Sequence, residues 1–193
     1  MDFILDMAVR FWPMTIFIIL VIIGFIINLF DKKIDNRVNF KYVDYPHMKP
    51  IRIATKGKGF WGAIILWFFG TRHWEVVKDF NYSLDGKKYI IPKGFKFDGA
   101  SVPKFLAQFL SPVGLLLIGG LIHDYGYKYE TLLLKDKKTI GKKTQKWMDE
   151  TFRDINIEVN GFYFLNYLAY WALRLGGFVA WNKHRDVDAK IGE

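Results

Sequence analysis

Cysteine is absent from this 193-residue chain, which excludes disulfides, thiolate metal ligands and a cysteine nucleophile. The chain also lacks a glycine-rich phosphate-binding loop and any Cys/His pattern typical of zinc sites. Histidine is scarce, with four residues in all. Thiol chemistry therefore has no part in any functional site of this chain.

Positive charge and aromatic side chains are abundant. The formal net charge is +9 and aromatic residues make up 18% of the chain. A basic chain is attracted to nucleic acid or to an anionic membrane surface. Because many of the aromatic residues lie in apolar runs, the composition favours a membrane surface over nucleic acid as the partner.

The longest apolar run covers residues 12–30 and contains no charged residue. At 1.5 Å per residue a helix of this length spans roughly 28 Å, about the thickness of a bilayer's hydrocarbon core. A cleaved signal peptide fits poorly, since the start carries Asp2 and Asp6 and no small-residue cleavage site follows. We therefore expect an uncleaved transmembrane anchor in a single-pass membrane protein.

Basic residues are concentrated after this run, at Lys32, Lys33, Arg37 and Lys41. By the positive-inside rule they place the C-terminal domain in the cytoplasm. The length allows one domain plus an attachment. We expect four parts: an N-terminal segment with the anchor, a juxtamembrane linker with a first strand, an α+β domain and a charged tail, over 1–31, 32–58, 59–181 and 182–193.

Two further apolar runs, residues 60–70 and 161–181, leave alternatives open. The first is too short to span a bilayer, so it is a buried core segment or a helix at a membrane interface. The second is long enough to span. Because Arg174 is costly inside a bilayer, it is interpreted as a core helix ending at Gly176-Gly177, with membrane insertion as the alternative.

The middle of the chain predicts strands and the later part predicts helices. Strands are expected over 74–77, 80–84 and 87–91, the last two joined by an Asp85-Gly86 hairpin turn. Helices are expected over 104–110, 111–123 and 142–155. The predicted fold class is α+β: an N-terminal transmembrane helix, then a small antiparallel sheet packed with several helices.

Four residues with apolar surroundings are the candidate site: Asp98, His123, Asp124 and Asp149. Buried carboxylates need cations, dense hydrogen bonding or protonation, and a divalent metal ion held by all four side chains is one solution. His123 and Asp124 are the candidate catalytic residues, with Asp124 as a metal ligand or general base. The alternative is a structural cluster in which Asp98 caps a helix. A nucleophilic Ser101 set with His123 is disfavoured, because the pattern around Ser101 is that of a helix cap.

A lysine-rich segment follows the candidate site, at Lys135, Lys137, Lys138, Lys142, Lys143 and Lys146. A solvated loop is the simpler interpretation. Binding to anionic lipid or nucleic acid is the functional one.

The motif Pro-x-Gly-Phe-x-x-Asp-Gly-Ala-Ser-Val-Pro over 92–103, followed by His-Asp-Tyr at 123–125 and Asp149, resembles the domain-of-unknown-function 1353 family of phages and prophages. The resemblance covers residues 74–181. It implies a viral or prophage origin and a site at the four candidate residues, but it supplies no reaction.

Together these features predict a membrane-anchored phage or prophage protein with a hydrolase-like acid/histidine site, with or without a divalent metal ion as cofactor. Its substrates would be phosphoesters or cell-wall material. The alternative is a non-enzymatic virion or membrane-interaction protein for genome delivery, exclusion or lysis. The expected partners are membrane lipid and other phage proteins, and nucleic acid is not favoured.

Overall fold

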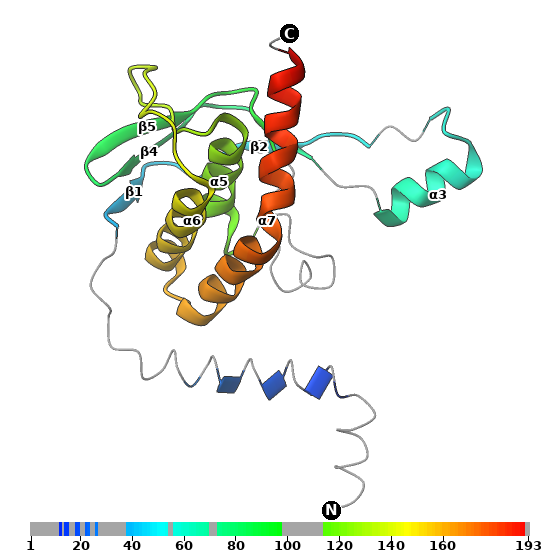
Figure 1. The fold of residues 1–193 in the computed structure, drawn as a ribbon, viewed down its shortest axis with the longest axis horizontal. Helices are drawn as coiled ribbons and strands as arrows, with labels where there is room; N and C mark the ends of the chain where they lie inside the picture. Colours follow the sequence, from blue (N-terminus) through cyan, green and yellow to red (C-terminus); the bar gives the residue numbers. More distant parts are fainter. Residues whose placement is uncertain are drawn as a thin grey trace, which may run out of the picture.

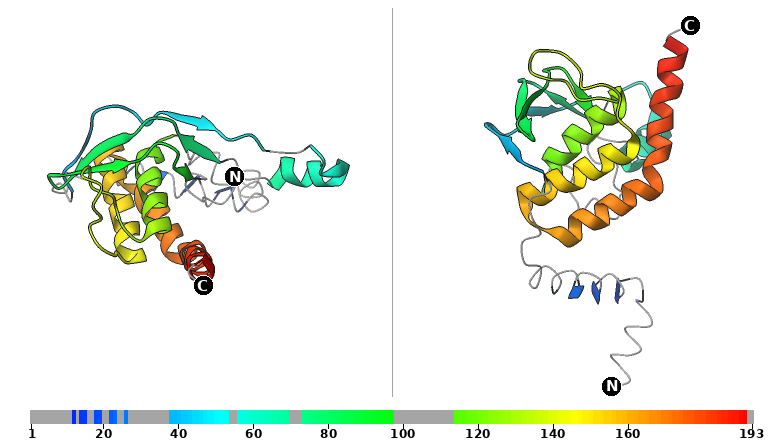
Figure 2. Two further views of the ribbon diagram at one scale, coloured as in Figure 1. Left: turned by 90° about the horizontal axis from the view of Figure 1, so that it is seen from above. Right: turned by 60° about the vertical axis from the view of Figure 1, so that its left-hand side comes forward.

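The computed structural model describes residues 38–53, 56–69, 73–97 and 114–191, together with eight single positions between Trp12 and Ile26. Strands lie on one side and three helices, α5, α6 and α7, lie side by side on the other (Figures 1 and 2). The predicted α+β class with small antiparallel sheets and several helices is confirmed.

The first sheet is built around the predicted hairpin. Strands β4 (Phe80–Leu84) and β5 (Lys87–Ile91) pair antiparallel, and β1 (Phe40–Tyr42) pairs with the other edge of β4. Asp85 and Gly86 form the turn with φ angles of 50° and 77°. A two-residue hairpin turn of this kind needs positive φ at both positions, which Asp-Gly supplies at low cost.

The second sheet is smaller and has the order β2-β3-β6. Its strands are β2 (Met48–Pro50), β3 (Trp74–Val76) and β6 (Lys96–Phe97), paired antiparallel. The strand expected over 74–77 is β3. The second sheet leads directly into the candidate residue Asp98, which lies outside the described residues.

The helical layer consists of α5 (Leu117–Tyr129), α6 (Gln145–Asn160) and α7 (Tyr163–Ile191). Thr144 caps the start of α6, its hydroxyl oxygen accepting from the Trp147 N–H at 3.2 Å. Gly161, with a φ of 66°, ends α6. The helices expected over 111–123 and 142–155 thus exist with shifted ends, whereas the one expected over 104–110 lies outside the described residues.

Helix α7 differs from its prediction at the C-terminal end. It runs through Gly176 and Gly177 and continues to Ile191, so the expected end at the glycine pair is wrong. Gly177 is buried against Tyr127 of α5, and tertiary packing therefore outweighs the low helix propensity of glycine there.

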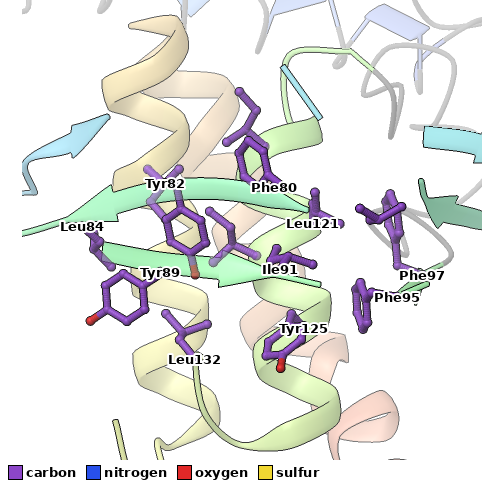
Figure 3. Close-up of a cluster of buried hydrophobic side chains, with 14 of the residues drawn as sticks. Phe80, Tyr82, Leu84, Tyr89, Ile91, Phe95, Phe97, Leu121, Tyr125 and Leu132 are labelled. Atoms are coloured by element: carbon purple, nitrogen blue, oxygen red, sulfur yellow. The ribbon is translucent and has the colours of Figure 1, made fainter. Parts of the chain in front are cut away.

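The core lies between the first sheet and α5. Alternate residues of the hairpin, including Tyr82, Tyr89 and Ile91, face Leu121 and Tyr125 of α5 (Figure 3). Ile91 and Leu121 have no exposed surface. The Tyr82 and Tyr89 rings stack with centroids 5.3 Å apart, a cross-strand pair that fixes the register of the hairpin.

The expectation of a single-pass membrane protein is corrected by the structure. Of residues 12–30 it describes eight positions, and in the described part of the chain no helix is both long enough and apolar enough to cross a bilayer. Helix α7 has the length, but its polar and charged residues lower its mean hydropathy.

Helices α3 (Gly59–Phe69) and α7 both carry exposed apolar side chains. Helix α3 projects away from the other helices, with Phe60 and Trp61 each 73% exposed (Figure 1). The described side chains of residues 60–66 therefore do not form the buried core segment considered above. On α7, exposed apolar residues recur at helical spacing opposite the buried Asn166 and Tyr170: Trp171, Leu175, Phe178 and Val179.

Candidate functional site

A buried carboxylate, Asp149 of α6, joins the three packed helices. One oxygen, Oδ1, lies 2.9 Å from His123 Nε2 and accepts from the Tyr127 hydroxyl at 2.5 Å. The other, Oδ2, accepts from the Arg174 guanidinium at 2.7 Å. Asp149 has no exposed surface. Both oxygens are therefore satisfied, and we call Asp149, His123, Tyr127 and Arg174 the Asp149 cluster.

The helices bring these side chains together by spacing and by close approach. His123 and Tyr127 are four residues apart on α5 and so share one face. Gly126 of α5 lies against the Met148 side chain of α6. Because a Cβ at Gly126 would overlap the Met148 sulfur, the glycine allows α5 and α6 to approach closely enough for His123 to reach Asp149.

His123 lies between two carboxylates. Its Nε2 faces Asp149, and its Nδ1 lies 3.7 Å from Asp124 Oδ1. Burial alone lowers the pKa of His123, but hydrogen bonds and charge from Asp124 and Asp149 outweigh burial and raise it above the ordinary value. The arrangement therefore favours a protonated imidazole.

The pKa values of Asp149 and Tyr127 are also shifted, in opposite directions. Burial by itself raises the pKa of Asp149, but hydrogen bonds from His123, Tyr127 and Arg174 reverse this and lower it. Burial and the adjacent Asp149 carboxylate raise the pKa of Tyr127. Asp149 is thus held ionised and Tyr127 is held as a hydrogen-bond donor.

The raised pKa of His123 makes stability depend on pH. Since the folded state holds this proton more tightly than the unfolded chain, its contribution is complete below about pH 6.5 and is lost as pH rises through the folded pKa. We expect the free energy of unfolding to fall over that window with a slope of at most about 1.4 kcal/mol per pH unit. Urea titrations between pH 6 and 9 measure it. His123→Gln, which keeps a polar partner for Asp149 but does not titrate, should remove the slope, and an equal slope in that variant would contradict the assignment.

A second polar contact joins α5 to the C-terminal half of α7. Arg185 donates to the main-chain carbonyls of Tyr127 and Lys128 at 2.7 and 3.0 Å, and its guanidinium lies 2.8 Å from Glu130. Lys142 reaches Glu130 from the other side at 3.0 Å. These cations lower the pKa of Glu130, Lys142 contributing the most. Arg185 thus satisfies carbonyls at the end of α5 that have no partner within the helix.

Of the four candidate residues, the structure brings His123, Asp124 and Asp149 together, while Asp98 lies outside the described residues. Within the described segments no three His, Asp or Glu side chains are arranged to hold a metal ion. His123 Nε2 is already engaged by Asp149 and leaves only Nδ1 for another partner. The predicted metal site depends on Asp98 and stays a prediction.

Sequence reasoning missed Tyr127 and Arg174. Tyr127 could have been found from its four-residue spacing to His123 on one helix. Arg174 was noted only as a cost to membrane insertion, yet an arginine within an apolar helix needs an anionic partner, and a buried aspartate is the natural one.

The fold and the cluster define an α+β domain whose helices are joined through a buried aspartate bonded to histidine, tyrosine and arginine. The model of the family described as "Protein of unknown function (DUF1353)" matches residues 74–173, just over half of the chain, so the chain belongs to the DUF1353 family. No curated protein and no solved structure matches it.

The match begins where the resemblance predicted and ends at 173 rather than 181. It contains His123, Asp124 and Asp149, and it stops one residue before Arg174. A phage or prophage origin stays a prediction from the family resemblance.

Proposed function

We propose that this DUF1353 protein is a hydrolase-like enzyme in which Asp124 accepts a proton from an attacking water molecule. One observation carries the proposal: the His123 ring lies between buried Asp149, at 2.9 Å, and Asp124, at 3.7 Å. The Asp124 side chain is 16% exposed and is the only one of the three that reaches solvent to that extent. The three groups therefore lead from the core to the surface.

The order of the three side chains from the core to the surface assigns a role to each of them. Arg174 and Tyr127 hold the Asp149 carboxylate, which in turn orients the imidazole of His123. The imidazole presents Nδ1 to Asp124 and limits the directions in which that carboxylate can point. A carboxylate held in this way can take a proton from water as the water oxygen attacks a phosphorus or carbonyl carbon, and can return that proton to the alcohol or amine that leaves as the P–O, C–O or C–N bond breaks. We propose phosphoesters or cell-wall material as the substrate classes.

Asp124→Asn tests the proposal, because it keeps the shape of the side chain and removes the proton acceptor. Turnover on panels of phosphoesters and peptidoglycan fragments should fall by about 10²- to 10⁴-fold. Asp136→Asn, an exposed change in the loop after α5, is the matched control and should leave turnover unchanged. Absence of turnover by the unmodified protein on both panels, or full activity of Asp124→Asn, would contradict the proposal.

A second candidate is a non-enzymatic protein whose polar cluster is structural. The observation that favours it is the saturation of Asp149, which has no exposed surface and uses both oxygens within the fold. In that case Asp124→Asn lowers the free energy of unfolding, and no substrate in either panel is turned over. Urea denaturation beside the activity assay therefore separates the two candidates.

A further inference from the structure

One corner of the first sheet gathers lysines from three parts of the chain. Lys87 and Lys88 begin β5, directly after the hairpin turn. The segment after α5 folds back beside them: Leu134 bridges to Tyr89, and the Lys135 N–H donates to the Lys88 carbonyl at 2.9 Å. Leu133 pairs with Thr139, so residues 133–139 form a small hairpin with Lys137 and Lys138 near its tip (Figure 1).

Strand register adds a lysine from β1. Lys41 pairs with Ser83 of β4, and Ser83 pairs with Lys88 of β5. Residues directly opposite each other in a sheet point to the same face, so Lys41 and Lys88 share one face, about 10 Å apart across two strand spacings. The neighbouring residues Tyr82 and Leu84 are buried on the opposite face.

We call this group the lysine corner, and all six of its members are exposed: Lys41, Lys87, Lys88, Lys135, Lys137 and Lys138. Lys87 pairs with Leu84 and therefore points to the other face of the sheet, at its end. Lys138 lies 3.7 Å from Asp136, a weak contact. In the described segments the other five lysines form no ion pair. The acids at the same end of the sheet are Asp85, which accepts from the Asn39 N–H at 2.9 Å, and Asp136, so the six lysines outnumber the carboxylates and leave an excess of positive charge.

The later lysines of the same segment are already engaged. Lys142 lies 3.0 Å from Glu130, and Lys146 lies 3.9 Å from Glu150. Lys143 lies over the Trp147 ring at 5.1 Å. Within the lysine-rich segment, the lysines before residue 140 thus lie beside the sheet, whereas those after it contact acidic or aromatic side chains.

We propose that the lysine corner binds the phosphate backbone of nucleic acid. Lysine is a compact point charge, and several unpaired lysines spaced along a sheet suit a polymer with regularly repeated phosphates. A lipid-binding surface would combine such charge with apolar side chains that insert among lipids. No large exposed apolar residue falls within 83–88 or 133–141, and those next to the corner are Tyr42 and Val43, which follow Lys41 at the edge strand β1.

The test is fluorescence anisotropy of the full chain with a 20-base-pair duplex of mixed sequence, between 50 and 200 mM salt. About five phosphate contacts predict a slope of about −4 to −5 in a plot of log K against log salt. Lys88→Glu with Lys135→Glu should weaken binding at least 10-fold and make the slope smaller by about two. Lys56→Glu with Lys58→Glu removes the same charge from the exposed segment before α3 and should change binding little.

Circular dichroism establishes that both double variants fold. The proposal is overturned if the duplex does not bind at 50 mM salt, or if the control pair weakens binding as much as the corner pair. It is also overturned if vesicles containing phosphatidylserine bind through the corner while the duplex does not. Its outcome is distinguishable from that of the hydrolase proposal, because anisotropy measures binding rather than turnover and both double variants leave Asp124 unchanged.

Discussion

Replacing Asp149 by asparagine is expected to lower the free energy of unfolding by about 3–5 kcal/mol. The carboxylate is fully buried and accepts from His123, Tyr127 and Arg174. An amide keeps the size of the side chain but removes the charge, and its NH₂ group faces donors rather than acceptors. The cost is mainly that of leaving the cationic imidazole and guanidinium without their counter-charge.

The matched control is Asp44→Asn. Asp44 forms an ion pair with Lys78 at 3.0 Å, and both side chains are about 60% exposed. Exposed pairs contribute about 0–1 kcal/mol, so this variant should unfold close to the unmodified protein. Urea denaturation of both variants at pH 7 gives the comparison. A loss below about 1 kcal/mol in Asp149→Asn would show that the three helices do not depend on this carboxylate.

Gly177→Ala is expected to destabilise the protein by about 1–3 kcal/mol. A Cβ at Gly177 would lie 2.6 Å from the Tyr127 hydroxyl and 3.2 Å from Gln145 Nε2. These two groups are hydrogen-bonded to each other, and Tyr127 also donates to Asp149. The methyl group therefore forces α7 away from α5 or displaces the hydroxyl from the Asp149 cluster.

The neighbouring residue supplies the control. A Cβ at Gly176 meets nothing within 4 Å, so alanine there should stabilise the helix by about 0.5–1 kcal/mol through its higher helix propensity. The two substitutions are chemically identical and adjacent on one helix. Opposite signs in thermal or urea unfolding are the expected result. Stabilisation by both substitutions would mean that propensity, and not the contact with Tyr127, decides the effect at Gly177.

Local patterns predicted the parts of the fold that depend on local chemistry. Asp85-Gly86 predicts a two-residue turn because both positions need positive φ, and the alternating residues on either side form β4 and β5 with that turn between them. The apolar spacing around Trp147 and Phe152 predicted a helix there, and α6 is that helix. Where an element is determined by residues within a few positions of one another, the local sequence pattern is enough to predict it.

The Asp149 cluster could be predicted only in part, because its contacts join residues 22 to 26 positions apart on different helices. His123 and Asp149 were recognised as polar groups in apolar surroundings. Nothing local to Arg174 indicates which acid it meets, since that depends on how α7 crosses α6. For the same reason the helix was expected to end at Gly176-Gly177, where packing against α5 instead continues it.

The anchor prediction relied on composition alone. An uncharged run of 19 residues meets the composition criterion for a bilayer span, but most of that run lies outside the described residues. Among the residues that the structure describes, no helix combines the required length and hydropathy.

The ion pairs of Arg174 and Arg185 must form late while the chain is being synthesised. Both arginines belong to α7, which follows α5 and α6 in the chain, so α5 and α6 emerge from the ribosome while Asp149 and Glu130 still lack these arginines. Until α7 arrives, the helix pair holds a carboxylate that is only partly compensated, and this partly folded chain is less stable than the finished one. A nascent chain stalled before residue 174 should therefore be digested by a protease much faster than one in which all of α7 has left the ribosome. The domain thus commits to its native state only once α7 is available.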